Sequence, residues 1–393
     1  MSMRKKIVSA AVALILGAGL ILSGCGGKQE EFQAKPETGI APAFSESLGY
    51  FNENPSVITL SETEKYVYYT RNDEKFSDES EYIAVRRATL SGGVWQYEEP
   101  TAALTPSDEG WDSGRVFQAD VVCGNFLFNG EEYGFLMAYA GNSLQNSRRA
   151  AQIGLAVSKS AAGPFVRVGE QPFLTWSADD YSQYGQETTD GVNEPSLVSY
   201  DKAGKILLFY SLYNPNTVNS CRFLTLDLSS DLSELAGRKG ERGNVLSNKG
   251  VADMETNSNC VGADFALTED GQTLVCVRDY NPIAATSPAV AQAVQVLSAP
   301  VQILMQTIGD ASPAWAILND KISSLDTAVW EEDGKPGYDR IYSACIVSDG
   351  YARIANAQEF SLMFTSSSVA AVNAAYKYTP MLHDFAVSAE VTA

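Results

Sequence analysis

Pairs of short hydrophobic runs recur along the chain, and each pair is joined by a turn that contains Gly or Asp. Apolar residues in these runs alternate with polar ones or stand several together, which predicts β-strands that pair as hairpins. The expected pairs are residues 56–60 with 66–70, 120–128 with 134–140, 196–200 with 206–211, and 264–268 with 273–277, and a weaker fifth copy lies at 341–347. Helical periodicity is hard to find, so the pattern predicts an all-β chain.

The five units begin at similar intervals, about 70 residues apart, which is typical of a repeat architecture. Their polar first residues are Asn54, Asp120, Glu194, Asp264 and Arg340. A unit of this length holds four antiparallel strands with their loops, which makes one propeller blade, and a closed ring of blades leaves no long strand edge exposed. The predicted fold is therefore a five-bladed β-propeller over residues 46–393. A pair of β-sandwiches is the alternative, for which less regular spacing is expected.

Two segments do not follow this pattern. Residues 283–330 are rich in Ala, Val and Gln and are compatible either with a helix that begins at Ser287 or with further strands. Residues 366–393 could supply the strand that closes the ring. The hydrophobic pattern leaves both alternatives open.

The N-terminus has the pattern of an exported lipoprotein. Three basic residues, Arg4, Lys5 and Lys6, precede an apolar run over 7–22, and the run ends in Leu-Ser-Gly before Cys25. Small residues before a cysteine allow cleavage there, and the thiol then carries a lipid. A transmembrane anchor is the alternative, but the run is short for a bilayer span of about 20 residues. We therefore expect residues 1–24 to be a signal peptide and Cys25 to be lipidated.

Residues 25–45 contain mostly Gly, Lys, Gln, Glu and Pro, with few large apolar side chains. Such a segment buries too little apolar surface to repay the entropy of ordering its backbone. The sequence predicts a flexible tether here, with the propeller held on the outer face of a bacterial membrane by the lipid on Cys25.

Charge and rare residue types exclude several function classes. The chain has 28 Lys and Arg against 48 Asp and Glu, a net charge of -20, which repels nucleic acid and anionic lipid. A neutral partner such as a carbohydrate suits this surface, although solubility is the simpler reason for the charge. His383 is the one histidine, which excludes multi-histidine zinc sites. Apart from Cys25, the cysteines form an odd set without a C-x-x-C pair and are expected to be buried free thiols.

Polar residues at the heads of the units are the candidates for chemistry. Inner strands of a propeller start near its axis, so Asp120, Glu194 and Asp264 are expected to converge there. Carboxylates gathered in one funnel raise one another's proton affinity, and glycoside hydrolysis needs one protonated and one ionised carboxylate. These three are the candidate catalytic residues, with Glu194 and Asp120 preferred as the acid and its modulator. The candidate substrate-binding residues are Asn54, Trp111 and Arg340.

Three segments resemble the five-bladed propeller glycosidases of glycoside hydrolase family 43 and its relatives. Residues 117–122 (Phe-Gln-Ala-Asp-Val-Val) are similar to that family's Trp-Ala-Pro-Asp-Val segment, and 193–198 (Asn-Glu-Pro-Ser-Leu-Val) resemble its Ile-Asp-Pro-Ser segment. Residues 153–158, which are followed by Gly-Pro-Phe at 163–165, are similar to a sequence segment that this family has at a blade edge. The resemblance covers residues 50–365 and implies an inverting glycosidase fold.

The chain departs from the family where the chemistry is expected. The family's catalytic base is an Asp before Pro in the first blade, and this chain has Asn54 there, whose amide cannot accept a proton from water at neutral pH. Either Glu53 or Asp73 serves instead, or the base is lost. The resemblance matches Glu194 to the residue that tunes the acid and Asp264 to the general acid. It also makes an axial calcium or sodium ion conceivable, but no motif implies a metal or another cofactor.

Three functions follow from these observations. The first is a surface lipoprotein that hydrolyses arabinose- or xylose-containing glycans of plant or host polysaccharides by acid-base catalysis. The second is a non-catalytic glycan-binding propeller, for which Asn54 at the base position is the deciding feature. The third is a purely structural surface propeller that neither binds nor cleaves a glycan.

Overall fold

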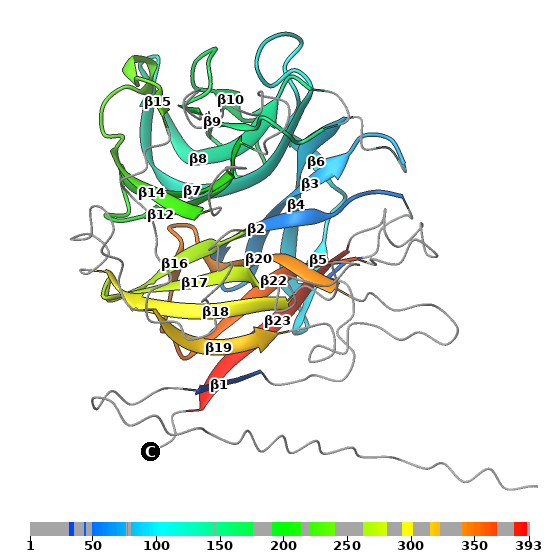
Figure 1. Cartoon of the computed structure of the whole chain (residues 1–393), viewed down its shortest axis with the longest axis vertical. Coiled ribbons are helices and arrows are strands. Elements are labelled where there is room, and N and C mark those ends of the chain that lie inside the picture. The colour runs from blue at the N-terminus through cyan, green and yellow to red at the C-terminus, as the bar shows by residue number, and fades with distance from the viewer. Residues whose placement is uncertain are drawn as a thin grey trace, which may run out of the picture.

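The computed structural model describes residues 31–34, 43–44, 49–75, 77, 80–144, 147–175, 191–213, 220–239, 262–280, 293–301, 315–322, 340–367 and 381–390. Their regular structure is almost entirely β-strand (Figure 1). The strands group into five units, in each of which neighbouring strands along the chain pair antiparallel.

The first three units follow the order of the chain. Unit one contains β2 (Glu53–Ser61), β3 (Glu64–Asn72) and β4 (Glu81–Ser91), and β5 (Val94–Tyr97) and β6 (Thr101–Leu104) both pair with β4. Unit two contains β7 (Arg115–Phe128), β8 (Glu131–Asn142), β9 (Gln152–Ser158), β10 (Val166–Arg167) and β11 (Leu174–Thr175). Unit three contains β12 (Gly191–Ser199), β13 (Lys205–Tyr213) and β14 (Ser220–Asp227), followed by the short helix η2 (Leu232–Glu234). After it, β15 (Arg238–Lys239) pairs with β11 of unit two.

The last two units complete the ring. Unit four contains β16 (Asp264–Thr268), β17 (Thr273–Tyr280), β18 (Ala293–Pro300) and β19 (Ala316–Ile322). Unit five contains β20 (Arg340–Asp349), β22 (Glu359–Ser367) and β23 (Met381–Glu390), and the short β21 (Arg353–Ile354) pairs with β16 of unit four. β1 (Glu31–Ala34), from the beginning of the chain, pairs with β23.

Contacts between the first strands of the units close the ring. β2 contacts β7, β7 contacts β12, β12 contacts β16, β16 contacts β20, and β20 returns to β2. The last of these contacts includes a short parallel pairing of β20 with β2. This cyclic order is that of a propeller, and the predicted all-β propeller is confirmed, with five units among the described residues.

The predicted hairpins are confirmed by the strand register. Residues 56–60 and 66–70 belong to β2 and β3, and the next three predicted pairs belong to β7 with β8, β12 with β13, and β16 with β17. The described part of residues 283–330 forms β18 and β19, so the strand alternative is right for these residues. The C-terminal strand β23 pairs with β22, and the outermost pairing of this unit is made by β1.

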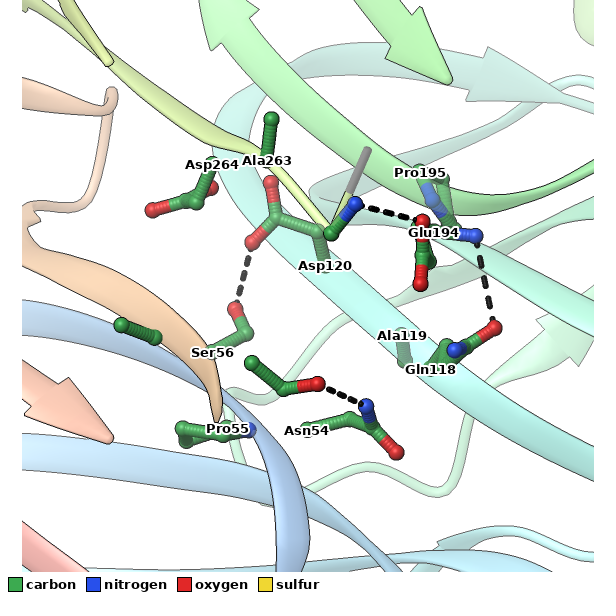
Figure 2. Close-up of a pocket in the computed structure, with 13 residues that line it drawn as sticks. Asn54, Pro55, Ser56, Gln118, Ala119, Asp120, Glu194, Pro195, Ala263 and Asp264 are labelled. Carbon is green, nitrogen blue, oxygen red and sulfur yellow. Dashed lines mark hydrogen bonds between the residues drawn. The ribbon is translucent and has the colours of Figure 1, made fainter. Parts of the chain in front are cut away.

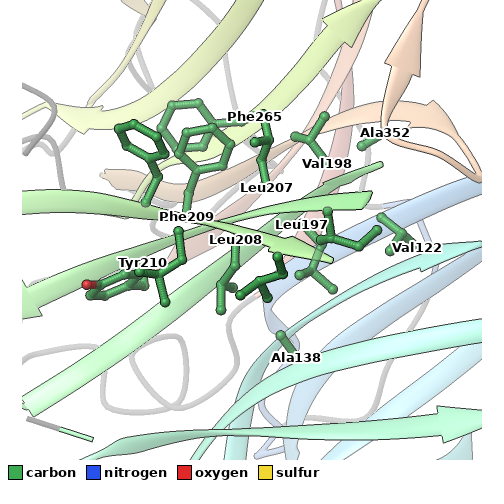
Figure 3. Packing of buried hydrophobic residues seen from close by; sticks show 14 of the residues in the cluster. Val122, Ala138, Leu197, Val198, Leu207, Leu208, Phe209, Tyr210, Phe265 and Ala352 are labelled. Atoms are coloured by element: carbon green, nitrogen blue, oxygen red, sulfur yellow. The ribbon is translucent and has the colours of Figure 1, made fainter. Parts of the chain in front are cut away.

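Apolar side chains pack between neighbouring blades rather than within one sheet. A large cluster joins units two, three and four, with Val122 and Ala138 on one side and the strand pair β12–β13 in the middle (Figure 3). On its other side, the Phe209 and Phe265 rings stack with centroids 3.9 Å apart. Each blade is therefore stabilised mainly by its neighbours, so residues far apart in sequence are held in fixed positions around the axis.

Part of the N-terminal segment belongs to the folded domain. The predicted tether extends to residue 45, but β1 lies within it and pairs in register with β23 over Glu31 to Ala34. Phe44, 8% exposed, packs its ring against Tyr69 and Tyr97 and beneath the guanidinium of Arg86. These contacts lie within the segment predicted to be a flexible tether, and the tether over 25–45 stays a prediction.

Within the part of the chain that the structure describes, no helix is long and apolar enough to cross a membrane. Residues 1–24 and Cys25 lie outside the described residues, so the signal peptide and the lipid on Cys25 stay predictions.

Candidate functional site

Four of the five inner strands carry a residue with a left-handed backbone at the point where their pairing is interrupted, and in unit four the corresponding left-handed residue lies two positions before β16. These five residues, called the bulge residues below, are Asn54 (φ 55°), Gln118 (φ 49°), Glu194 (φ 51°), Gly262 (φ 57°) and Ser343 (φ 44°). In units one, two, three and five the register with the second strand shifts across this position. A β-bulge re-aims a side chain away from the regular alternation, and here it turns the bulge residues toward the ring axis.

The bulge residues show that the predicted first residues of the five units are not all structurally equivalent. Asp120 and Asp264 were expected to be equivalent to Asn54 and Glu194, but they lie two positions after the bulge residues Gln118 and Gly262. Gln118 and Ser343 are therefore site residues that were not among the sequence-based candidates. A comparison of three-residue segments could have revealed them, because each segment begins with the bulge residue and continues with Pro or Ala. The segments of units one to five are Asn-Pro-Ser, Gln-Ala-Asp, Glu-Pro-Ser, Gly-Ala-Asp and Ser-Ala-Cys.

The bulge residues and the two residues after them form an axial pocket (Figure 2). Its lining comprises Asn54, Pro55, Ser56, Gln118, Ala119, Asp120, Glu194, Pro195, Gly262, Ala263, Asp264, Ser343 and Ala344. The cavity measures about 50 Å³, several times the ~10–15 Å³ that one water requires. The pocket therefore has room for a small polar group, such as the hydroxyls at one end of a sugar, but not for a whole disaccharide.

Backbone N–H groups of the bulge residues are bound by the preceding blade. The Asn54 N–H donates to Thr365 Oγ1 (3.1 Å), the Gln118 N–H to Thr70 Oγ1 (2.9 Å), and the Ser343 N–H to Asp279 Oδ1 (2.6 Å). Thr70 and Thr365 occupy the same place, opposite the residue before the bulge on the neighbouring strand. In these three junctions a side chain on the second strand of one blade accepts a hydrogen bond from the backbone N–H of the bulge residue in the next blade.

In the other two junctions, bulge residues themselves supply the acceptor. The Glu194 N–H donates to Gln118 Oε1 (3.4 Å), and the Gly262 N–H donates to Glu194 Oε2 (2.6 Å). The second-strand position holds Ala140 in unit two, which has no acceptor, and Ser211 in unit three. The carboxylate of Glu194 lies at the pocket, as predicted, and one of its oxygens holds the bulge of unit four.

Asp120 and Asp264 connect blades below the bulge residues. Asp120 accepts from Ser56 Oγ of unit one (2.5 Å) and from the Leu197 N–H of unit three (2.6 Å). Asp264 accepts from Ser196 Oγ of unit three (2.7 Å) and from the Ile346 N–H of unit five (2.7 Å). The convergence predicted for these carboxylates is present, and all four oxygens accept a hydrogen bond from a neighbouring blade. These contacts give both residues a structural role, whereas a catalytic role for them stays a prediction.

Burial favours the protonated form of both carboxyl groups. It raises the pKa of Asp120 to about 6, against the opposing effect of its hydrogen-bond donors. Burial and then the nearby charge of Asp120 raise the pKa of Asp264 to about 7, again against its donors. The sequence-based expectation that neighbouring carboxylates raise one another's proton affinity holds in direction for Asp264, with burial as the larger cause.

Asn54 lies at the pocket, at the position where the resembling family has its base. Its Nδ2 donates to Ser343 Oγ (2.8 Å), while its Oδ1 is buried and has no hydrogen-bond partner. Of the two alternative bases, Glu53 accepts hydrogen bonds from Arg148 Nη2 (2.5 Å) and Tyr342 Oη (3.0 Å). Asp73 is exposed at the turn after β3. Neither Glu53 nor Asp73 lines the pocket.

The other predicted substrate-binding residues do not line the axial pocket. Trp111 is half-buried and stacks on Tyr139 of unit two, with ring centroids 5.7 Å apart. Arg340 is the first residue of β20, and its side chain lies outside what the structure describes. The Trp111 ring packs against Gly154, where an added Cβ would lie 2.7 Å from the ring.

The described cysteines and acidic residues suggest no metal centre. Cys123, Cys221, Cys276 and Cys345 are free thiols, and all but the half-buried Cys123 are buried. Among the described residues, no three His, Cys, Asp or Glu side chains gather as metal ligands do.

No protein-family model matches the sequence, and no curated protein matches it significantly. Among solved structures, the chain is similar to Zg3597, a family 117 glycoside hydrolase of the marine bacterium Zobellia galactanivorans. The TM-score is 0.52 at 12% identity, over 92% of this chain and 91% of that one. It is also similar to the catalytic domain of the GH62 alpha-L-arabinofuranosidase of Coprinopsis cinerea, with TM-score 0.51 at 12% identity over 92% and 98%.

A GH62 hydrolase in complex with xylotriose is a third similar structure, with TM-score 0.50 at 9% identity over 93% of this chain and 98% of that one. At such identities the likeness concerns the fold. The chain therefore shares the fold of these glycoside hydrolases, which confirms the sequence-based resemblance at that level.

Proposed function

We propose that this chain, built on the fold of the glycoside hydrolases, binds a carbohydrate in its axial pocket and does not cleave it. The observation that carries the proposal is Asn54 Oδ1, a buried acceptor without a partner at the wall of the pocket. Burying such an acceptor unpaired costs about 1–3 kcal/mol, which a ligand hydroxyl that donates to it would recover. A GH62 hydrolase of the same fold has been crystallised with xylotriose, which supports a xylose- or arabinose-containing ligand.

The polar groups around the pocket suit a neutral sugar. Asn54, Gln118 and Ser343 present amide and hydroxyl groups from three different blades, and Glu194 adds a carboxylate from a fourth. Amides and hydroxyls both donate and accept hydrogen bonds, as sugar hydroxyls do. This ring of groups can therefore hold one end of a glycan by its hydroxyls without a charged ligand.

Hydrolysis would need a second working carboxylate beside Glu194. An inverting glycosidase uses one carboxyl group as acid and one carboxylate as base, about 6.5–9.5 Å apart with a water between. Within the described lining, Asp120 and Asp264 accept bonds from neighbouring blades with both oxygens, and the position of the family's base is the amide of Asn54. These contacts favour binding over hydrolysis of arabinose- or xylose-containing glycans.

Replacing Asn54 by glycine tests whether the axial pocket binds carbohydrate. Glycine adopts the left-handed backbone without strain and removes the amide, so we expect affinity for xylotriose or arabinotriose to fall about tenfold by isothermal titration calorimetry. Asn129→Gly is the matched control, because Asn129 has a similar φ of 53° but lies in the exposed turn between β7 and β8. Its affinity should equal that of the wild type.

Chromatography of the trisaccharide after long incubation with the wild-type protein distinguishes binding from hydrolysis. Intact trisaccharide together with binding is the expected result. Release of shorter sugars by the wild type would instead establish a glycoside hydrolase. Absence of both binding and cleavage would favour the purely structural propeller.

We further propose that the mature protein is a surface lipoprotein, anchored on the outer face of a bacterial membrane by a lipid on Cys25. The basic residues, the apolar run and the Leu-Ser-Gly-Cys end support this placement. Cells fed radiolabelled palmitate should label the protein, and Cys25→Ser should abolish the label, while Cys123→Ser should keep it. Equal labelling of Cys25→Ser and wild type would refute the anchor.

A further inference from the structure

A second cavity lies at the hairpin end of β7 and β8, away from the axial pocket. It measures about 720 Å³ and is lined by residues 125–127 of β7, residues 132–134 of β8 and Lys159, which directly follows β9. This volume falls within the ~300–1,000 Å³ of small-ligand sites, whereas the axial pocket measures about 50 Å³. The second cavity, called the hairpin cavity below, therefore has room for several sugar units.

The hairpin cavity and the axial pocket lie toward opposite ends of β7. Gln118 of the axial pocket is near the beginning of this strand, and Asn125 of the hairpin cavity comes seven residues later. At ~3.3 Å per residue, the two positions are roughly 20 Å apart. The two linings share no residue, so the hairpin cavity is a separate site.

Gly134 lines the hairpin cavity, and the packing of the described chain gives no reason for a glycine there. It lies within β8 without a left-handed backbone, and a Cβ added to it would have no atom of the described residues within 4 Å. Gly124, in the facing bulge of β7, differs, because a Cβ there would lie 2.4 Å from the Ala203 oxygen of unit three. Glycine inside a strand weakens the strand, and it often marks the close approach of another backbone or of a ligand. Since no described backbone approaches Gly134, its position favours a ligand.

The lining of the hairpin cavity combines an aromatic ring with polar groups. Tyr133 is half-buried, and Asn125, Glu132 and Lys159 are exposed around it. Lys159 Nζ lies 5.4 Å from the centroid of the Tyr133 ring and 2.8 Å from Glu131 Oε2. Glu132 and Lys159 carry opposite charges, so the lining is neutral in sum and suits a neutral ligand.

We propose that the hairpin cavity is a second carbohydrate-binding site, which takes a neutral stretch of the same class of glycan as the axial pocket. A sugar ring has apolar C–H groups on its faces and hydroxyls at its edge. It can therefore pack against Tyr133 while its hydroxyls bond the amide of Asn125 and the carboxylate of Glu132. The ammonium group of Lys159 has three N–H donors, of which Glu131 takes one, so it can also donate to a sugar hydroxyl. The class of glycan rests on the proposed function, whereas the cavity and its lining do not.

Gly134→Ile tests the site by filling the cavity. Its Cβ enters open space, and isoleucine suits a strand and adds no aromatic surface, so the melting temperature should equal or exceed that of the wild type. Native mass spectrometry counts the bound ligands. We expect two molecules of xylotriose or arabinotriose on the wild-type protein and one on Gly134→Ile. Isothermal titration calorimetry should show the remaining site at its wild-type affinity.

Gly237→Ile is the matched control. Gly237 is exposed, belongs to neither lining and has no left-handed backbone, and the atom nearest to its added Cβ is 3.5 Å away. This control should bind two trisaccharides. Asn125→Ala is a second test that leaves the cavity open, and removing the exposed amide should weaken one of the two sites about 3- to 10-fold. It decides the question if Gly134→Ile lowers the melting temperature.

The other outcomes separate the second site from the axial pocket. Two trisaccharides on a stable Gly134→Ile, or one on the wild type that this variant keeps, would overturn the second site and leave the axial pocket as proposed. The loss of one ligand in both Gly134→Ile and Gly237→Ile would overturn it too, because the loss would not depend on position. One ligand on the wild type that Gly134→Ile loses and Asn54→Gly keeps would support the second site and overturn the axial one. No trisaccharide on the wild type would overturn both.

Discussion

Replacing Glu81 by leucine will lower the free energy of unfolding by about 3 to 5 kcal/mol. Glu81 is 1% exposed and bridges two guanidinium groups, bonding Arg115 Nη1 at 3.0 Å and Arg148 Nε at 2.9 Å. Removing the carboxylate takes away the counter-charge of the buried Arg115 in a region of low dielectric constant. Urea unfolding followed by circular dichroism measures the change.

Glu64→Leu is the control for this prediction. Glu64 pairs with Arg87 at 2.6 Å, but both side chains are partly exposed, at 29% and 45%. A solvent-exposed pair contributes about 0–1 kcal/mol, so the control should change stability little. Similar losses in the two variants would show that burial does not distinguish the two ion pairs.

The Glu81 network also adjoins the axial pocket. Arg148 reaches from the loop between β8 and β9 to Glu53, and its guanidinium lies over the Phe117 ring. Glu53 and Phe117 each precede a bulge residue of the pocket. The network therefore ties the inner strands of units one and two together immediately beside the site, and it occupies the carboxylate of Glu53 that could otherwise serve as a base.

Stability will fall as the pH rises from about 4 to about 7, by on the order of 6 kcal/mol for the two groups together, because each unit of pKa difference between the folded and unfolded states corresponds to about 1.4 kcal/mol. The pKa of Asp120 is raised to about 6 and that of Asp264 to about 7 by burial, whereas both titrate near 3.8 in the unfolded chain. Between these values the folded state binds more protons than the unfolded state, so raising the pH favours unfolding. The contribution is complete below about pH 3.8, the pKa in the unfolded chain, and is lost above about pH 7. Thermal unfolding in buffers from pH 4 to 8 checks the slope.

The double variant Asp120→Asn, Asp264→Asn isolates these two groups. Its stability should be nearly independent of pH from 4 to 7, whatever its absolute value. A wild-type slope that persists in the double variant would assign the effect to other groups. Asp231 acts in another window, because its hydrogen bonds lower its pKa to about 2, so its contribution is lost only as the pH falls below about 4.

Much of the architecture was predictable from local pattern. Short apolar runs bounded by turn residues, such as 206–211, identify strands, because a strand buried on both faces carries apolar side chains at successive positions. The even spacing of the hairpins identifies a repeat, and the repeat implies a ring, since only a closed ring covers the edges of so many short strands. Composition was a weaker guide in the N-terminal segment, where the backbone of β1 pairs with β23.

The amino-acid order alone determined the strands, their hairpins, the propeller and the presence of Asn54 and Glu194 near its axis. Which atoms carry hydrogen bonds there was decided only by the tertiary structure. The left-handed backbone residues place Gln118 and Ser343 at the pocket, where Asp120 and Asp264 also form part of the lining and link neighbouring blades. Likewise, the Gly262 N–H is bound by Glu194 of β12 and not by Ser211 of β13, whose Oγ has no hydrogen-bond partner. These contacts join residues from different strands and blades, and their geometry depends on how whole blades pack, which a local pattern does not contain.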